Sequence, residues 1–169
     1  KYMDFYERTY YNSILSSQNP ETGMTTYFQP MATGYFKVYS SEYDHFWCCT
    51  GSGMESFSKL GDTMYMHSGN TLYVNFYQSS VLTWKEQNVK ITQESTIPDG
   101  ETVTFTVEGS GDLDLRFRIP DWKAGNITVK VNGQKTAYTD INGYAQISRR
   151  FSNGDKIELT IPEEVQAHT

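Results

Sequence analysis

Two adjacent cysteines, Cys48 and Cys49, are the only thiols in this chain of 169 residues and the side chains best suited to chemistry. They come shortly before Ser52 and Glu55, whose spacing is typical of a capping box, so we predict a helix that begins near Ser52. The partial positive charge of a helix N-terminus favours the thiolate, which is the form of cysteine that attacks carbon or binds a metal. Because neighbouring cysteines close a disulfide only with strain, we do not expect a structural bridge.

The residues around the thiols leave other interpretations open. Both cysteines could instead fill an apolar core beside Phe46 and Trp47, because free cysteine is among the residue types most often buried. His45, Asp44 and Glu42 are close enough in sequence to complete a local metal site, although polar residues near one another usually just line a loop. Trp47 and, more weakly, His45 are also candidates for contact with a substrate, since sugar C–H faces pack against aromatic rings.

Composition sets the broad class of the protein. Hydrophobic residues make up 37% of the chain and aromatic residues 15%, which indicates a folded core. The net charge is −6, and the 14 Lys and Arg residues form no cluster, so the sequence lacks the electrostatic pattern of a nucleic-acid binder. No apolar stretch approaches the roughly 20 residues that cross a bilayer, and no signal segment opens the chain. We expect a soluble chain.

The first part of the chain is predicted to be helical, with an extended segment in its middle. Apolar residues recur at helical spacing over residues 4–17, until Asn19-Pro20 interrupts the pattern. Residues 24–47 are rich in aromatic side chains and predict a hairpin around Gly34, which leads into the cysteines and a second helix. The sequence changes character near residue 62.

From Thr63 onward, apolar and polar residues alternate with the period of a β-strand. In one strand, Leu113, Leu115, Phe117 and Ile119 are predicted to face the core, with Asp112, Asp114, Arg116 and Arg118 on the other face. Asn132-Gly133 favours a type I′ hairpin turn, and Asp99-Gly100 and Asn153-Gly154 are similar turn signals. The expected fold is mainly β, an antiparallel β-sandwich preceded by a short helical segment, and a closed barrel is the alternative.

An ordered series of motifs resembles the bacterial beta-L-arabinofuranosidases of glycoside hydrolase family 127, formerly described as a domain of unknown function. The motifs are Tyr6-Glu7-Arg8, Phe46-Trp47-Cys48-Cys49-Thr50-Gly51-Ser52-Gly53-Met54-Glu55, Lys59-Leu60-Gly61-Asp62-Thr63-Met64-Tyr65, Leu115-Arg116-Phe117-Arg118-Ile119-Pro120-Asp121-Trp122 and Val129-Lys130-Val131-Asn132-Gly133. The resemblance covers nearly the whole chain. It implies that residues 1–62 are the incomplete C-terminal end of an (α/α)6-barrel catalytic domain and that residues 63–169 are a β-sandwich domain.

The same resemblance implies a retaining glycoside hydrolase that acts on arabinose-containing plant glycans. Cys48 matches the family's nucleophile and zinc ligand, and Cys49 matches a neighbouring zinc ligand. The acid/base carboxylate and the other zinc ligands of that family lie upstream of this motif and have no counterpart here. We therefore expect a fragment of a longer enzyme that is inactive alone, holds zinc weakly or not at all, and self-associates through surface left uncovered. Its compartment, whether bacterial cytoplasm, periplasm or exterior, depends on the missing start.

A function of another class stays open. The chain could act as a non-catalytic β-sandwich accessory module, either structural or carbohydrate-binding, in which the cysteines only pack. Zinc binding that depends on Cys49 would distinguish the enzyme from this module.

Overall fold

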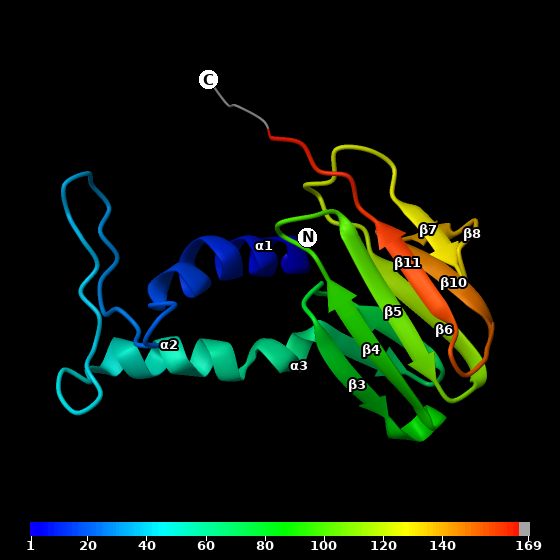
Figure 1. The fold of residues 1–169 in the computed structure, drawn as a ribbon, viewed down its shortest axis with the longest axis horizontal. Coiled ribbons are helices and arrows are strands. Elements are labelled where there is room, and N and C mark those ends of the chain that lie inside the picture. The colour runs from blue at the N-terminus through cyan, green and yellow to red at the C-terminus, as the bar shows by residue number, and fades with distance from the viewer. Residues whose placement is uncertain (166–169) are drawn as a thin grey trace. The chain divides into compact units, whose positions relative to one another are not determined.

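The computed structural model describes residues 1–165, in which helices precede two β-sheets (Figure 1). The chain divides into two compact units, Lys1–Thr63 and Met64–Thr169. The mainly β structure with a short helical segment before the sheets confirms the predicted fold class. Within the described residues, no helix is long and apolar enough to cross a membrane.

The first unit is built from three short helices and a long loop. Helix α1 (Tyr2–Thr9) continues as a π-helical turn (Tyr10–Ile14) and a 3-10 turn (Leu15–Ser17), so the predicted helical segment ends where expected. After the loop come α2 (Cys48–Ser58) and α3 (Leu60–Met64).

The predicted hairpin over residues 24–47 is wrong in its extent. Across this segment, two isolated bridges, Gln18 with Thr25 and Thr26 with Tyr39, replace a continuous ladder. Gly34 does sit at a turn with a φ of +87°. Most of its aromatic residues come in adjacent pairs instead of alternating with polar residues, so no face of the segment specifies a pairing register. The segment therefore forms a loop with exposed aromatic side chains.

The second unit is a sandwich of two sheets. The first sheet has five strands in the order β1 (Tyr65–Ser68), β2 (Thr71–Val74), β6 (Gly111–Arg118), β10 (Tyr144–Phe151) and β9 (Thr139–Ile141). The second sheet has six strands in the order β3 (Ser80–Trp84), β4 (Val89–Ser95), β5 (Thr102–Glu108), β11 (Lys156–Thr160), β7 (Thr128–Val131) and β8 (Gln134–Lys135). All neighbouring strands run antiparallel except β2 and β6, which are parallel. Two separate sheets, and not a closed barrel, make up this unit.

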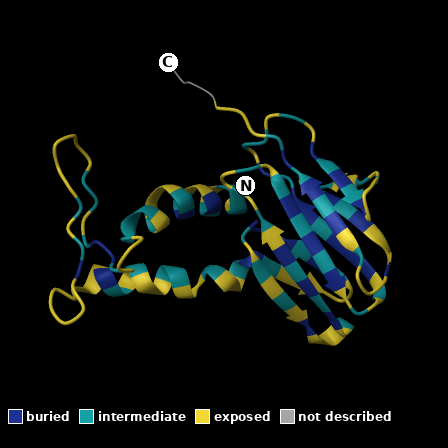
Figure 2. Cartoon of the chain, viewed as in Figure 1, coloured by how far each residue is buried: buried dark blue, intermediate teal, exposed yellow. Residues whose placement is uncertain are grey.

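Alternating side chains form the core between the sheets, as the sequence predicted. Figure 2 shows buried and more exposed residues in turn along the strands. Val103, Phe105 and Val107 of β5 are fully buried, and so are Leu115 and Phe117 of β6. The rings of Phe105 and Phe117 lie 4.8 Å apart and join the two sheets. Burial of this apolar surface is the main source of the unit's stability.

The polar face of β6 is more buried than simple alternation suggests. Asp112 is exposed, but Asp114 is 7% exposed, because neighbouring side chains cover it. Arg116 Nε donates to Asp114 Oδ2 at 2.9 Å, and Gln146 Nε2 donates to Asp114 Oδ1 at 2.7 Å. Arg116 also donates through Nη1 to the Tyr73 hydroxyl at 2.9 Å. These bonds satisfy the charges and make burial of the carboxylate tolerable.

The turns agree with their sequence signals in part. Asn132 and Gly133 have φ values of 50° and 78°, which confirms the type I′ turn between β7 and β8. Asn142-Gly143, with φ of 54° and 82°, makes a similar turn between β9 and β10 that the sequence analysis missed. In Asn153-Gly154 only the glycine has a positive φ, and Asp99-Gly100 has none.

Candidate active site

Helix α2 begins at Cys48, so both thiols lie in its first turn and not one turn before it. The N-cap is Trp47, whose carbonyl accepts from the amide of Thr50 at 3.0 Å. The predicted capping box is wrong, because the Ser52 hydroxyl donates to the Cys48 carbonyl at 3.3 Å within the helix. The free amides and positive end of the helix dipole are therefore closer to the sulfurs than the sequence suggested.

A buried threonine holds the start of α2 against the preceding loop. Thr25 Oγ1 donates to the Thr50 carbonyl at 3.2 Å, and both residues are buried. A Cβ atom at Gly53 would lie 3.2 Å from Thr25 Cβ, so glycine permits this close approach. The contact fixes the first turn of the helix, and with it the cysteines, relative to residues 25–27.

Neither thiol packs into a core. Cys48 and Cys49 are both free and exposed, and the neighbouring Phe46 and Trp47 are 62% and 44% exposed. The interpretation of the pair as buried filler is therefore wrong for this structure. Reagents and ligands can reach both sulfurs.

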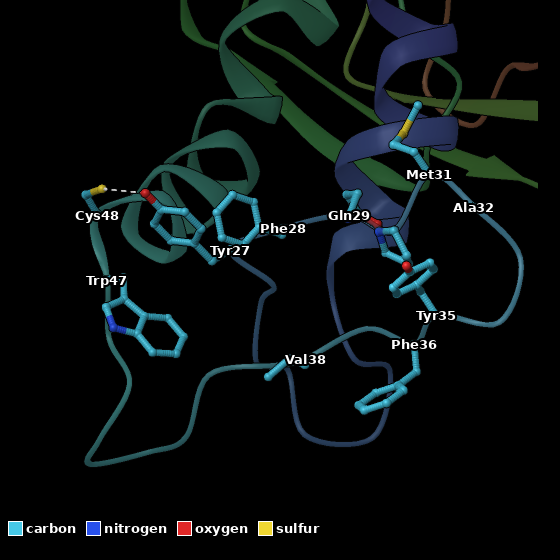
Figure 3. A pocket seen from close by; sticks show the side chains of 11 residues that line it. Tyr27, Phe28, Gln29, Met31, Ala32, Tyr35, Phe36, Val38, Trp47 and Cys48 are labelled. Atoms are coloured by element: carbon cyan, nitrogen blue, oxygen red, sulfur yellow. Dashed lines mark hydrogen bonds between the residues drawn. The ribbon is translucent and has the colours of Figure 1, made fainter.

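The Tyr27 hydroxyl is a hydrogen-bond partner of the Cys48 thiol. Cys48 Sγ lies 3.8 Å from Tyr27 Oη, a contact drawn as a dashed line in Figure 3. When the sulfur is ionised, the tyrosine donates to it, and this bond, aided by Cys49, lowers the pKa of the Cys48 thiol. Interactions with Cys48 first and Cys49 second raise the pKa of Tyr27 to about 12, so the phenol stays protonated and able to donate.

Cys48 lies at one end of an open apolar hollow of about 940 Å³. Tyr27, Phe28 and Trp47 stand near the sulfur, and Met31, Tyr35 and Phe36 stand at the far end (Figure 3). The remaining lining residues are Gln29, Pro30, Ala32 and Val38. Aromatic walls with few polar groups suit the C–H face of a sugar or an apolar leaving group. No residue that lines the hollow is acidic.

The structure separates the two substrate-contact candidates. Trp47 lines the hollow beside Cys48, whereas His45 does not. The His45 ring packs on Trp47 at 5.3 Å, and its Nδ1 lies 3.5 Å from the Ser41 hydroxyl. His45 also has a φ of 60°, an uncommon backbone value for a residue with a side chain. His45 therefore contacts Trp47 but does not line the hollow.

The described residues hold no complete metal site. No group of three or more His, Cys, Asp or Glu side chains gathers anywhere in residues 1–165. Glu42, Asp44 and His45 therefore do not join the cysteines, contrary to the local set considered from the sequence. Cys48 and Cys49 are the two thiols of the chain, and thiolates are soft metal ligands.

Sequence reasoning did not single out Tyr27. It is 21 residues from Cys48, in a segment where aromatic residues are common. Its contact with the thiol follows from the path of the loop, which spacing does not encode. The nearest signal was the density of aromatic residues ahead of the cysteines.

Tyr27→Phe is expected to raise the pKa of Cys48, because it removes the donor that stabilises the thiolate. At a pH below the ordinary thiol range, fewer sulfurs are then ionised, and alkylation by iodoacetamide slows. The measurement is the rate of alkylation against pH by intact mass, in a Cys49→Ser background that leaves one thiol.

Tyr35→Phe is the matched control, since Tyr35 lines the same hollow far from the sulfur. Its rate of alkylation should depend on pH in the same way as that of the Cys49→Ser parent. An unchanged profile for Tyr27→Phe would show that the phenol does not stabilise the thiolate.

Comparison with known proteins places the chain among glycoside hydrolases. Residues 71–163 match the model of the beta-L-arabinofuranosidase GH127 middle domain, and residues 1–62 match that of the GH127 catalytic domain. A GH127 beta-L-arabinofuranosidase from Geobacillus stearothermophilus T6 is similar in structure, with 27% identity, a TM-score of 0.79 and coverage of 99% of this chain and 29% of that one. A second GH127 beta-arabinofuranosidase has 25% identity, a TM-score of 0.79 and coverage of 95% and 28%.

The chain thus spans less than a third of the length of these similar structures. No curated protein sequence matches it.

Proposed function

Because the chain belongs to the beta-L-arabinofuranosidases of glycoside hydrolase family 127, we propose that it forms part of a retaining beta-L-arabinofuranosidase with Cys48 as its nucleophile. The observation that carries the proposal is the place of Cys48. Its sulfur is exposed in the first turn of α2, at the wall of an apolar hollow, with a phenol that stabilises the thiolate. Residues 1–62 would then complete the catalytic barrel, and residues 63–169 would form a β-sandwich domain.

The proposed reaction proceeds by two displacements at the anomeric carbon. The Cys48 thiolate attacks this carbon, and a C–S bond forms as the bond to the leaving oxygen breaks. A carboxylic acid must protonate that oxygen, and it must come from outside the hollow described here, whose lining has no acid. The carboxylate left by that acid then accepts a proton from water, whose oxygen attacks the same carbon, so that the C–S bond breaks and the thiolate returns. Trp47 would hold the sugar face during both steps.

Cys48 and Cys49 would supply two sulfur ligands to a zinc ion. When bound, zinc keeps a thiol deprotonated at neutral pH and stabilises it as a leaving group. Residues 1–165 place no third Cys, His, Asp or Glu beside the pair. The other ligands are therefore expected in the part of the relatives' length that this chain does not span.

The purified 169-residue chain is expected to show no turnover of an aryl beta-L-arabinofuranoside and no zinc binding of nanomolar strength. Lack of a general acid alone costs about 10²- to 10⁴-fold in rate, and two sulfurs hold zinc less tightly than a full ligand set. A polypeptide that adds the rest of the catalytic domain should hydrolyse the substrate and hold one zinc, and Cys49→Ser should release the metal. The measurements are a colour assay and titration against a chromophoric chelator.

Light scattering on the same sample tests the surface of the first unit. Phe28, Met31, Tyr35, Phe36 and Tyr43 are each at least 75% exposed, so the chain should self-associate. Turnover by the 169-residue chain alone would contradict the proposal that its site is incomplete, and zinc-independent activity in the longer polypeptide would contradict the metal's role.

A further inference from the structure

The hollow beside Cys48 is larger than one sugar ring requires. Its volume is about 940 Å³, near the upper end of the roughly 300–1,000 Å³ of pockets that hold drug-sized ligands. Cys48 lies at one end, so a sugar whose anomeric carbon meets the sulfur occupies only that end (Figure 3). The far end, beside Met31, Tyr35 and Phe36, remains for another part of the substrate.

A loop that is bonded at its base to α2 carries the far end of the hollow. The Ser40 amide donates to the Thr25 carbonyl at 3.0 Å, so the two ends of residues 26–39 are held together. Thr25 Oγ1 also donates to the Thr50 carbonyl at 3.2 Å. The base of the loop is therefore joined to the first turn of the helix, which carries Cys48.

The chemistry decides which part of the substrate points along the hollow, and this step rests on the proposed function. In the first displacement, the nucleophile and the leaving oxygen lie on opposite sides of the anomeric carbon. The leaving oxygen and the group that it carries therefore point away from the Cys48 sulfur, toward the far end. The side chains of Tyr35 and Phe36 are 75% and 81% exposed, so their rings are open to a ligand.

We propose that Tyr35 and Phe36 form a subsite for the leaving group, which selects leaving groups with an apolar face over small ones. In the first displacement, the C–S bond forms, the bond to the leaving oxygen breaks, and the protonated leaving group departs as an alcohol. Its contacts with the two rings end there. The subsite therefore acts on kcat/KM, which includes the first displacement, and not on hydrolysis of the glycosyl-enzyme.

The test compares 2-naphthyl and methyl beta-L-arabinofuranoside in the polypeptide that adds the rest of the catalytic domain, with release of arabinose measured for both. Phe36→Ala should lower the ratio of kcat/KM for the naphthyl glycoside to kcat/KM for the methyl glycoside by about 2- to 10-fold, because packing of one aromatic pair contributes that much. Tyr35→Ala is a second variant with the same expectation. Circular dichroism checks that both variants fold.

Two matched variants serve as controls for the ratio. Tyr43 is 92% exposed and does not line the hollow, so Tyr43→Ala should keep the parent ratio. Trp47 lies beside the sulfur, where the sugar common to both substrates binds. Trp47→Ala should therefore lower kcat/KM for the two glycosides by the same factor.

Transfer of the sugar to an added alcohol gives a second measurement of the same subsite. After the first displacement, the oxygen of benzyl alcohol can attack the anomeric carbon in place of water. The C–S bond then breaks, the carboxylate accepts the proton of the alcohol, and the product is a benzyl arabinofuranoside. At equal concentrations, the parent should transfer more sugar to benzyl alcohol than to methanol, and Phe36→Ala should reduce this preference.

The outcomes separate the subsite from the proposed function. If the parent ratio persisted in both Phe36→Ala and Tyr35→Ala, or if the parent transferred sugar equally to the two alcohols, the subsite proposal would be overturned. Hydrolysis of both glycosides by Cys48→Ser at the parent rate would instead overturn the nucleophile, whatever the ratio in the other variants.

Discussion

Cys48→Ser is expected to lower kcat/KM for an aryl beta-L-arabinofuranoside by at least about 10⁴-fold, in a polypeptide that joins this chain to the rest of the catalytic domain. A serine hydroxyl is protonated at neutral pH, and neither the helix dipole nor the Tyr27 hydroxyl ionises it. The hollow and its aromatic walls remain, so KM should change much less than kcat. Steady-state kinetics over a range of substrate concentrations measures kcat and KM separately.

Ser52→Ala serves as the control for this prediction. Ser52 lies one turn along the same helix, and its hydroxyl only donates to the Cys48 carbonyl, so activity should stay within a few-fold of the parent. Mass analysis of the enzyme quenched during turnover should find the sugar on the peptide that contains Cys48. If Cys48→Ser kept substantial kcat, or the sugar were found on another side chain, Cys48 would not be the nucleophile.

The sandwich could be predicted because its signal is local. Alternation of Val103, Phe105 and Val107 identifies a strand and its buried face without knowledge of any partner. Asn132-Gly133 likewise encodes its own turn through residues that tolerate positive φ. The order of the strands was harder to predict from the sequence. Strand β2 pairs with β6 in parallel and sets Leu72 opposite Leu115, and no residue near either leucine in sequence specifies this pairing.

The sequence provided candidate residues for the site but not the geometry around them. The two thiols were recognisable from their spacing and from the resemblance of the motif around them. The start of α2 was misplaced because Ser52 and Glu55 fit a cap pattern, yet a serine inside a helix can bond the carbonyl four residues back. The Tyr27 contact was missed because it depends on the path of a loop that is bonded to α2 through Thr25 and the Thr50 carbonyl, and Thr25 is far from the cysteines in sequence.

Phe117→Ala should reduce the free energy of unfolding of the sandwich by about 3–5 kcal/mol, because the removed ring leaves a cavity that the sheets cannot close. Phe117 is 1% exposed, and its ring packs on Phe105 of the opposite sheet at 4.8 Å. A domain of this size is stable by only about 5–15 kcal/mol, so the change removes much of its stability. Urea unfolding, followed by the fluorescence of buried Trp84, measures the loss.

Val81→Ala is the control. Val81 is 59% exposed, so this change should lower the free energy of unfolding by at most about 0.5 kcal/mol. Equal urea midpoints for the two variants would show that the Phe105–Phe117 contact does not hold the sheets together.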